Sequence, residues 1–143
     1  MFWGEHSIRL DEKGRLFLPA KFRSQTEEGV VVLPDARECL TVLPLAVFEG
    51  RIEELLKAPI TAQRTQDFTR RMGSQMTVDT PDKQNRITLT PALLAHAGID
   101  RDALIIGALS RAEIWAPDKW AAEQVRISAL AAEHDEGEGI AMF

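Results

Sequence analysis

Cysteine is scarce in this sequence, and its scarcity excludes two classes of protein. Of the 143 residues only Cys39 is a cysteine, so no disulfide can form within the chain and a cysteine-rich zinc site is excluded. The three histidines, His6, His96 and His134, are scattered, and none stands at a metal-ligand spacing from another. We therefore expect no bound metal and no cofactor.

Long apolar runs are also missing. No stretch approaches the roughly 20 apolar residues that cross a bilayer. The first nine residues, which include Glu5, His6 and Arg9, lack the apolar core of a signal peptide. A hydrophobic fraction of 45% and a charged fraction of 27% are typical of a globular protein. We expect a cytoplasmic protein with no membrane partner, built as one ordinary domain or two very small ones.

Side chains that could support catalysis are few. General acid–base chemistry needs two titratable groups held close together with separated pKa values, but Asp11 and Glu12 are neighbours in an exposed turn that would shift neither pKa. Cys39 has no local histidine to act as a base. A glycine-rich phosphate loop is absent from the sequence. We therefore expect no catalytic residues, no enzymatic activity and no small-molecule ligand.

Positive charge is outnumbered, but it is unevenly distributed. The net charge is −5, which alone argues against nucleic acid as a partner. Residues 9–23 nevertheless contain five basic and two acidic side chains, whereas residues 113–143 contain seven acidic and two basic ones. Because local fields steer ligands, the basic end remains a candidate for binding a polyanion.

The chain contains an internal repeat. Residues 10–18 read LDEKGRLFL and residues 82–89 read DKQNRITL. At an offset of 71 they match at their polar positions: Asp11 with Asp82, Gly14 with Asn85, and Arg15 with Arg86. At an offset of 72, residues 40–48 match residues 112–120. Two matches in the same order predict a duplication into halves of about 70 residues.

The two halves predict the same order of elements. The strands expected in the first half cover residues 5–10, 15–18, 30–33 and 40–43. Those expected in the second half cover residues 74–79, 86–89, 103–108 and 113–115. Polar turns separate the first two strands of each half, at residues 11–14 and 80–85. Gly14 and Asn85 suit turn positions with positive φ.

Helices complete each half. A short helix follows the second strand, and in the second half it has Thr90 as N-cap, Pro91 at its first position and Gly98 past its end. A longer helix with an apolar stripe closes each half, and another helix is expected over residues 60–72. The predicted parts are a first repeat over residues 1–57, a helical linker over 58–73, a second repeat over 74–133 and a flexible acidic tail over 134–143.

The repeated turns form the candidate binding site. A single Asp-x-x-x-Arg turn is typical of a plain hairpin, in which the aspartate caps the turn and the arginine is solvated. Two such turns on one pseudo-twofold fold would face the same side. The resulting basic surface would consist of Arg9, Lys13, Arg15, Lys21, Arg23, Lys83 and Arg86. The turns would be supported by Asp11, Gly14, Asp82 and Asn85. An arginine fork suits phosphate oxygens or the O6/N7 edge of guanine.

Several motifs together resemble the MraZ family. They are Met1-Phe2 with Gly4-Glu5, the stretch LDEKGRLFLPAKFR and the second segment DKQNR. The resemblance covers nearly the whole chain. It implies an α+β fold of two tandem AbrB/SpoVT-like swapped-hairpin β-barrel units with flanking helices, and it implies Arg15 and Arg86 as DNA contacts. Asn85 stands where the family usually has glycine, and Trp3 where many members have a basic residue.

The resemblance also implies a function. Members are sequence-specific, nucleoid-associated transcriptional regulators that bind short direct repeats in double-stranded DNA, at the promoter of their own division and cell-wall gene cluster, as ring-shaped homo-oligomers. Repression of that cluster is the expected outcome here. Two alternatives stay open: an antitoxin-like DNA-binding module that holds a toxin through residues 135–139, and a ring scaffold that binds protein.

Overall fold

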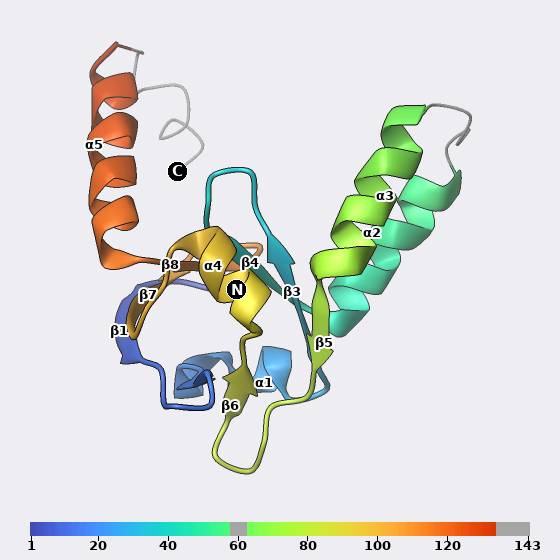
Figure 1. The fold of residues 1–143 in the computed structure, drawn as a ribbon, viewed down its shortest axis with the longest axis horizontal. Coiled ribbons are helices and arrows are strands. Elements are labelled where there is room, and N and C mark those ends of the chain that lie inside the picture. Colours follow the sequence, from blue (N-terminus) through green and yellow to red (C-terminus); the bar gives the residue numbers. More distant parts are fainter. Residues whose placement is uncertain (58–62, 134–143) are drawn as a thin grey trace.

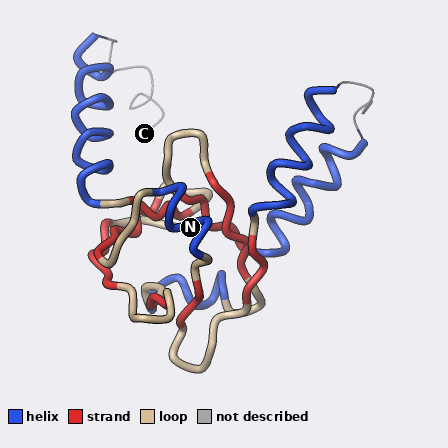
Figure 2. Tube along the Cα trace, in the orientation of Figure 1, coloured by secondary structure: helices blue, strands red, loops and turns tan. Residues whose placement is uncertain are grey.

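The computed structural model describes residues 1–57 and 63–133. The first half consists of β1 (Glu5–Arg9), β2 (Arg15–Phe17), η1 (Ala20–Phe22), α1 (Arg23–Thr26), β3 (Val30–Pro34), β4 (Leu40–Pro44) and α2 (Leu45–Lys57). After it come α3 (Gln63–Gln75), β5 (Thr77–Asp79), β6 (Arg86–Thr88), α4 (Pro91–Ala97), β7 (Asp102–Gly107), β8 (Ala112–Trp115) and α5 (Pro117–Glu133). The predicted acidic tail and the start of the predicted linker helix lie outside the described residues. The protein is α+β, as predicted (Figure 2).

The strands form two antiparallel sheets. A six-stranded sheet has the order β1-β7-β8-β4-β3-β5, and a two-stranded sheet joins β2 to β6. The order of the six-stranded sheet is symmetric under the repeat. Replacing each strand by its counterpart in the other half gives the same order read from the opposite end. β1 pairs with β7 and β5 pairs with β3, so the first strand of each half is added to the hairpin of the other half. Neither half therefore completes its sheet alone.

Both halves contribute to one main hydrophobic core. Leu16 and Leu18 of the first half lie in it together with Ile87 and Leu89 of the second half, and each of the four is less than 5% exposed. In a strand, alternate residues point to the same side, so these pairs flank one outward-facing residue in each half. The duplicated units therefore share one core across their pseudo-twofold relation.

The short helix after the second strand differs between the halves. In α4 the Thr90 hydroxyl accepts a hydrogen bond from the Leu93 N–H, Pro91 stands at the first position, and Gly98 ends the helix at φ 64°. The predicted caps are therefore confirmed. In the first half Pro19 is followed by η1 and the single turn of α1, and neither has a side-chain cap.

The segment before β5 corrects one prediction. Residues 74–79 are expected as a strand, but α3 continues to Gln75 and β5 begins at Thr77. The Met76 N–H donates to the Met72 carbonyl at 2.9 Å, which closes the last turn of α3. Both methionines pack against a small apolar cluster under the sheet, so tertiary packing favours helix there.

Helices α2 and α3 run side by side away from the sheets, and α5 projects separately (Figure 1). Of the helices in residues 1–57 and 63–133, none combines the length and apolar character needed to span a bilayer.

Candidate nucleic-acid interface

The loop between β1 and β2 is organised by Asp11. One carboxylate oxygen, Oδ1, accepts the backbone N–H groups of Lys13 and Arg15, each at 2.9 Å. The other, Oδ2, accepts the Arg15 Nε–H at 2.6 Å. The backbone closes the turn, because the Gly14 N–H donates to the Asp11 carbonyl at 3.0 Å. One aspartate thus fixes both the turn and the arginine side chain.

The loop between β5 and β6 repeats this arrangement bond for bond. Asp82 Oδ1 accepts the backbone N–H groups of Gln84 and Arg86, each at 2.9 Å. Asp82 Oδ2 accepts the Arg86 Nε–H at 2.8 Å, and the Asn85 N–H donates to the Asp82 carbonyl. The match detected in the sequence is therefore a match of hydrogen-bond networks.

Each loop is also bonded to the other half. The Leu89 N–H donates to the Gly14 carbonyl, and the Leu18 N–H donates to the Asn85 carbonyl, both at 2.9 Å. Gly14 and Asn85 have φ of 75° and 62°, as the sequence predicts. A Cβ on Gly14 would lie 2.8 Å from the Leu89 oxygen, whereas the Asn85 amide donates to the Leu18 carbonyl at 3.0 Å. The two loops are therefore fixed to each other, and Figure 1 shows both toward the lower end of the molecule.

The arginines emerge on one face of the β2–β6 ladder. Arg15 lies opposite Thr88, Leu16 opposite Ile87, and Phe17 opposite Arg86. The central pair is buried, so the two flanking pairs point outward together. The side chains of Arg15 and Arg86 are 32% and 21% exposed, so neither guanidinium is enclosed in the core. We call the outward residues Arg15, Phe17, Arg86 and Thr88 the ladder face.

Hydrogen bonds perturb both loop carboxylates, so the expectation from the sequence that the turn leaves the pKa of Asp11 unshifted is wrong. The bond from the Arg15 backbone N–H, followed by those from the Arg15 side chain and the Lys13 N–H, lowers the pKa of Asp11 below its ordinary 3.8. The bond from the Arg86 backbone N–H, with those from the Arg86 side chain and the Gln84 N–H, lowers the pKa of Asp82 in the same way. Both carboxylates are charged at neutral pH and hold their arginines electrostatically.

The other basic residues predicted for the site are not repeated between the two halves as the arginines are. Lys13 and Lys83 are exposed at the loop tips, but at the 71-residue offset Lys83 matches Glu12, and Lys13 matches Gln84. Arg9 ends β1 opposite Asp102 of β7.

Two further basic residues come from the segment after β2. Arg23 lines a small cleft with Asp82, Lys83 and Asn85, so it joins the second loop from the first half of the chain. Lys21 lies over the Trp3 ring, with its Nζ 4.3 Å from the ring centroid. Arg23 therefore extends the loop region, whereas Lys21 packs on an aromatic ring at the N-terminus.

Phe17 and Thr88 are two residues of the ladder face that were not predicted from the sequence. Phe17 is 55% exposed, and Thr88 is exposed as well. The strand alternation contained the signal, because a strand that buries Leu16 and Leu18 must turn Phe17 outward.

A cluster of potential metal ligands lies elsewhere in the fold. One ligand atom each of Asp35, Cys39 and Glu113 falls within 4.8 Å of the others. Glu113 already accepts bonds from Arg111 and from the Trp115 indole, and Asp35 accepts from the Arg37 N–H and the Thr41 hydroxyl. Burial, reinforced by the neighbouring carboxylates, raises the pKa of the Cys39 thiol. These contacts account for the cluster as part of the internal hydrogen bonding.

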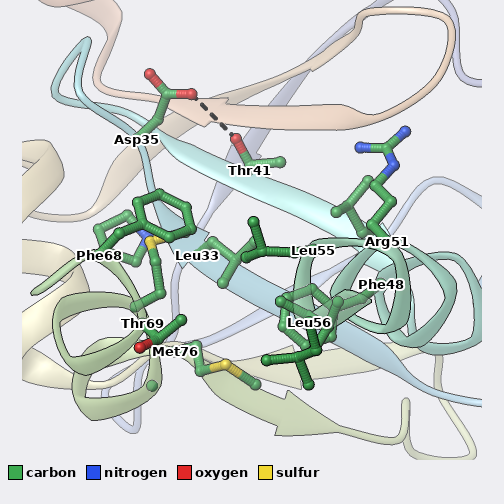
Figure 3. A pocket seen from close by; sticks show the side chains of 15 residues that line it. Leu33, Asp35, Thr41, Phe48, Arg51, Leu55, Leu56, Phe68, Thr69 and Met76 are labelled. Atoms are coloured by element: carbon green, nitrogen blue, oxygen red, sulfur yellow. Dashed lines mark hydrogen bonds between the residues drawn. The ribbon is translucent and has the colours of Figure 1, made fainter. Parts of the chain in front are cut away.

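An apolar groove of about 650 Å³ lies between the α2–α3 pair and the strands β3 and β4. Figure 3 shows Phe48, Leu55 and Phe68 among the side chains that line it, with Arg51 at its rim. The groove differs chemically from the ladder face, because its lining is mostly apolar.

Fold and site together define a class of protein: a tandem-repeat α+β chain whose halves exchange strands and present twin Asp–Arg loops beside one ladder. A family model described as "MraZ protein, putative antitoxin-like" matches residues 1–71 and 74–140. The chain therefore belongs to the MraZ family.

Curated relatives agree with this assignment. The chain is 47% identical to the transcriptional regulator MraZ of Parafrankia sp. (strain EAN1pec) over 84% of each chain. It is 44% identical to the transcriptional regulator MraZ of Thermobifida fusca (strain YX) over 93% of this chain and 95% of the relative. It is 47% identical to the transcriptional regulator MraZ of Arthrobacter sp. (strain FB24) over 84% of each. These names describe regulation of transcription rather than catalysis of a reaction.

Proposed function

We propose that this protein is a sequence-specific DNA-binding regulator of transcription and that the ladder face is its DNA contact. The observation that carries the proposal is the duplicated network that fixes Arg15 and Arg86 on one outward face. In each loop the aspartate carboxylate accepts a hydrogen bond from the arginine Nε–H. Among the described residues neither Nη nitrogen of these two arginines forms a hydrogen bond. The terminal nitrogens suit bidentate contacts to phosphate oxygens or to guanine O6 and N7.

The geometry of the ladder supports a contact in the major groove, which admits a two-stranded β-ribbon. Fixed arginines lose little conformational entropy on binding, because the aspartates already restrict them. Lys13, Lys83 and Arg9 would add contacts to the sugar-phosphate backbone, where a point charge is sufficient. In this scheme the arginines read sequence and the lysines add affinity that depends on salt.

We also propose that the fold is of a specific type, two swapped-hairpin units. The exchange of β1 and β5 between the halves supports a swapped-hairpin arrangement of the AbrB/SpoVT kind. The predicted division into two repeats and a linker is part of this proposal.

Assembly into a ring is a further part of the proposal. Val125, Ile127 and Leu130 on α5 are 71%, 46% and 40% exposed, and the α2–α3 groove offers an apolar surface of matching character. Helix α5 of one copy seated in the groove of the next would give a head-to-tail contact that closes into a ring. A ring brings several ladder faces to repeated sites on promoter DNA in the nucleoid, and linked weak contacts raise the avidity of a chain whose net charge is −5.

A mobility-shift assay with the DNA upstream of its own gene tests the proposal. We expect a salt-sensitive complex, with fewer bound species for a fragment that retains fewer direct repeats. A matched fragment of shuffled sequence serves as control. Equal binding to both fragments would contradict sequence specificity, and no binding to either would contradict the proposal and favour a protein-binding scaffold.

The antitoxin-like alternative has one observation in its favour, which is the description of the family itself. It assigns toxin binding to residues 135–139, which lie outside the described residues. A toxin gene beside this gene, whose product co-purifies with the protein and alters the DNA complex, would favour that alternative.

A further inference from the structure

The two halves differ at one place on the ladder face. Under the pseudo-twofold relation Arg15 corresponds to Arg86, and Phe17 corresponds to Thr88. Each arginine has the counterpart residue of the other half directly across the ladder. Arg86 therefore faces a phenyl ring, whereas Arg15 faces a hydroxyl-bearing side chain with one methyl group. The twin loops are alike in hydrogen bonding but unequal in what flanks their arginines.

Phe17 acts on Arg86 directly. The guanidinium carbon of Arg86 lies 5.8 Å from the centroid of the Phe17 ring, within the range of a cation–π interaction. Arg86 is thus held by the Asp82 carboxylate and by an aromatic ring, and its side chain is less exposed than that of Arg15, 21% against 32%.

The ring of Phe17 is also free to meet a partner. It is 55% exposed, while its strand neighbours Leu16 and Leu18 fill the core. Burial in the core therefore does not account for an aromatic side chain at this position. An exposed ring between two arginines presents an apolar contact on an otherwise cationic face.

We propose that Phe17 is a specificity-determining residue that positions Arg86 and contacts the C5-methyl group of a thymine in the major groove. This inference rests on the proposed DNA-binding function. Apolar contact with that methyl group is how phenylalanine distinguishes thymine from other bases. Thr88 reaches less far beside Arg15, so the two halves read unequal half-sites. A subunit with unequal halves binds its site in one orientation.

Selection of binding sites from a random duplex library tests the base preference. The full-length protein is compared with Phe17→Thr, which copies the other half, and with Phe17→Tyr, which keeps the ring. We expect the wild type and Phe17→Tyr to select a thymine next to the position read by Arg86. Phe17→Thr should lose the preference at that position and keep the remainder of the motif. Thr88→Phe is the matched reverse change and should add a thymine preference beside the position read by Arg15.

Replacing that thymine by deoxyuridine isolates the methyl group. The replacement should weaken wild-type binding about fourfold, the factor expected from one buried methyl group. It should change binding of Phe17→Thr by less than about twofold on the same scale. If the ring merely stabilised the fold, its removal in Phe17→Thr would lower the thermal midpoint and leave the response to deoxyuridine as it is in the wild type. Melting curves of all variants are therefore recorded alongside.

The outcomes separate this inference from the proposed function. Wild-type protein that selects a motif but shows the same motif and the same response to deoxyuridine after Phe17→Thr would overturn the role of Phe17 and leave DNA binding intact. Wild-type protein that selects no motif and shows no salt-dependent binding would overturn both.

Discussion

Leu16 and Ile87 are direct cross-strand partners at the centre of the β2–β6 ladder, and each is at most 1% exposed. They come from opposite halves of the chain, 71 positions apart in sequence. Their contact holds the two arginine-bearing loops in a fixed relation, because each loop leads directly into one of these strands. The core of the protein and the geometry of its candidate DNA face therefore depend on the same pair.

Truncation of this pair should destabilise the protein strongly. Leu16→Ala or Ile87→Ala leaves a cavity in the shared core, at a cost of about 2–5 kcal/mol in the free energy of unfolding. Urea denaturation followed by circular dichroism measures the change. Val47→Ala, at a position 40% exposed on α2 and outside the apolar groove, is the control and should stay within about 0.5 kcal/mol of the wild type. Equal effects at the core and control positions would refute the shared core.

Gly14 should not tolerate a side chain. Its φ of 75° and the Leu89 oxygen 2.8 Å from an added Cβ predict that Gly14→Ala lowers the free energy of unfolding by more than about 1 kcal/mol. Gly50→Ala is the matched control, because Gly50 lies within α2, outside the groove, with open space around it. That change should stabilise by about 0.5–1 kcal/mol. Thermal melts of both variants give the comparison, and a stabilised Gly14→Ala would contradict the loop geometry.

The loop aspartates should make stability depend on acidity. Their pKa values are lower in the folded state than the ordinary 3.8, so their contribution is complete above the unfolded pKa and is lost as pH falls through the folded pKa. The free energy of unfolding should therefore fall as pH decreases below about 5.

The matched variant for this prediction is Asp11→Asn with Asp82→Asn, which should flatten the pH dependence. Glu123, whose pKa Arg126 also lowers, will preserve part of the slope in the double variant. Urea denaturation at a series of pH values from 3 to 7 measures it, and a double variant with the full wild-type slope would show that the loop carboxylates are not perturbed.

The local features of the fold were predictable from the sequence. Thr90, Pro91 and Gly98 define α4 because each has a capping role that depends only on its neighbours. The Asp–Arg loops were predictable for a similar reason, since a turn that needs positive φ selects glycine or asparagine. The repeat added a second, independent copy of the same signal.

The relation between the halves was not predictable in detail. The exchange that pairs β1 with β7 and β5 with β3 depends on contacts far apart in sequence, and an alternating strand fits either hairpin equally well. The role of Met76 was also missed, because helix continued by tertiary packing has no local signature. Phe17 was overlooked in an apolar run, although the alternation around it indicated an outward side chain.

The most direct test of the account is the affinity of arginine variants for the upstream DNA, measured by fluorescence anisotropy across a salt series. We predict that Arg15→Ala and Arg86→Ala each raise Kd by about 5- to 150-fold, from about 1–3 kcal/mol per contact, while both variants stay folded at the assay temperature. Arg70→Ala, at an exposed position on α3 paired with Asp67, should leave Kd unchanged. Wild-type affinity in the Arg15→Ala, Arg86→Ala double variant would contradict the central claim.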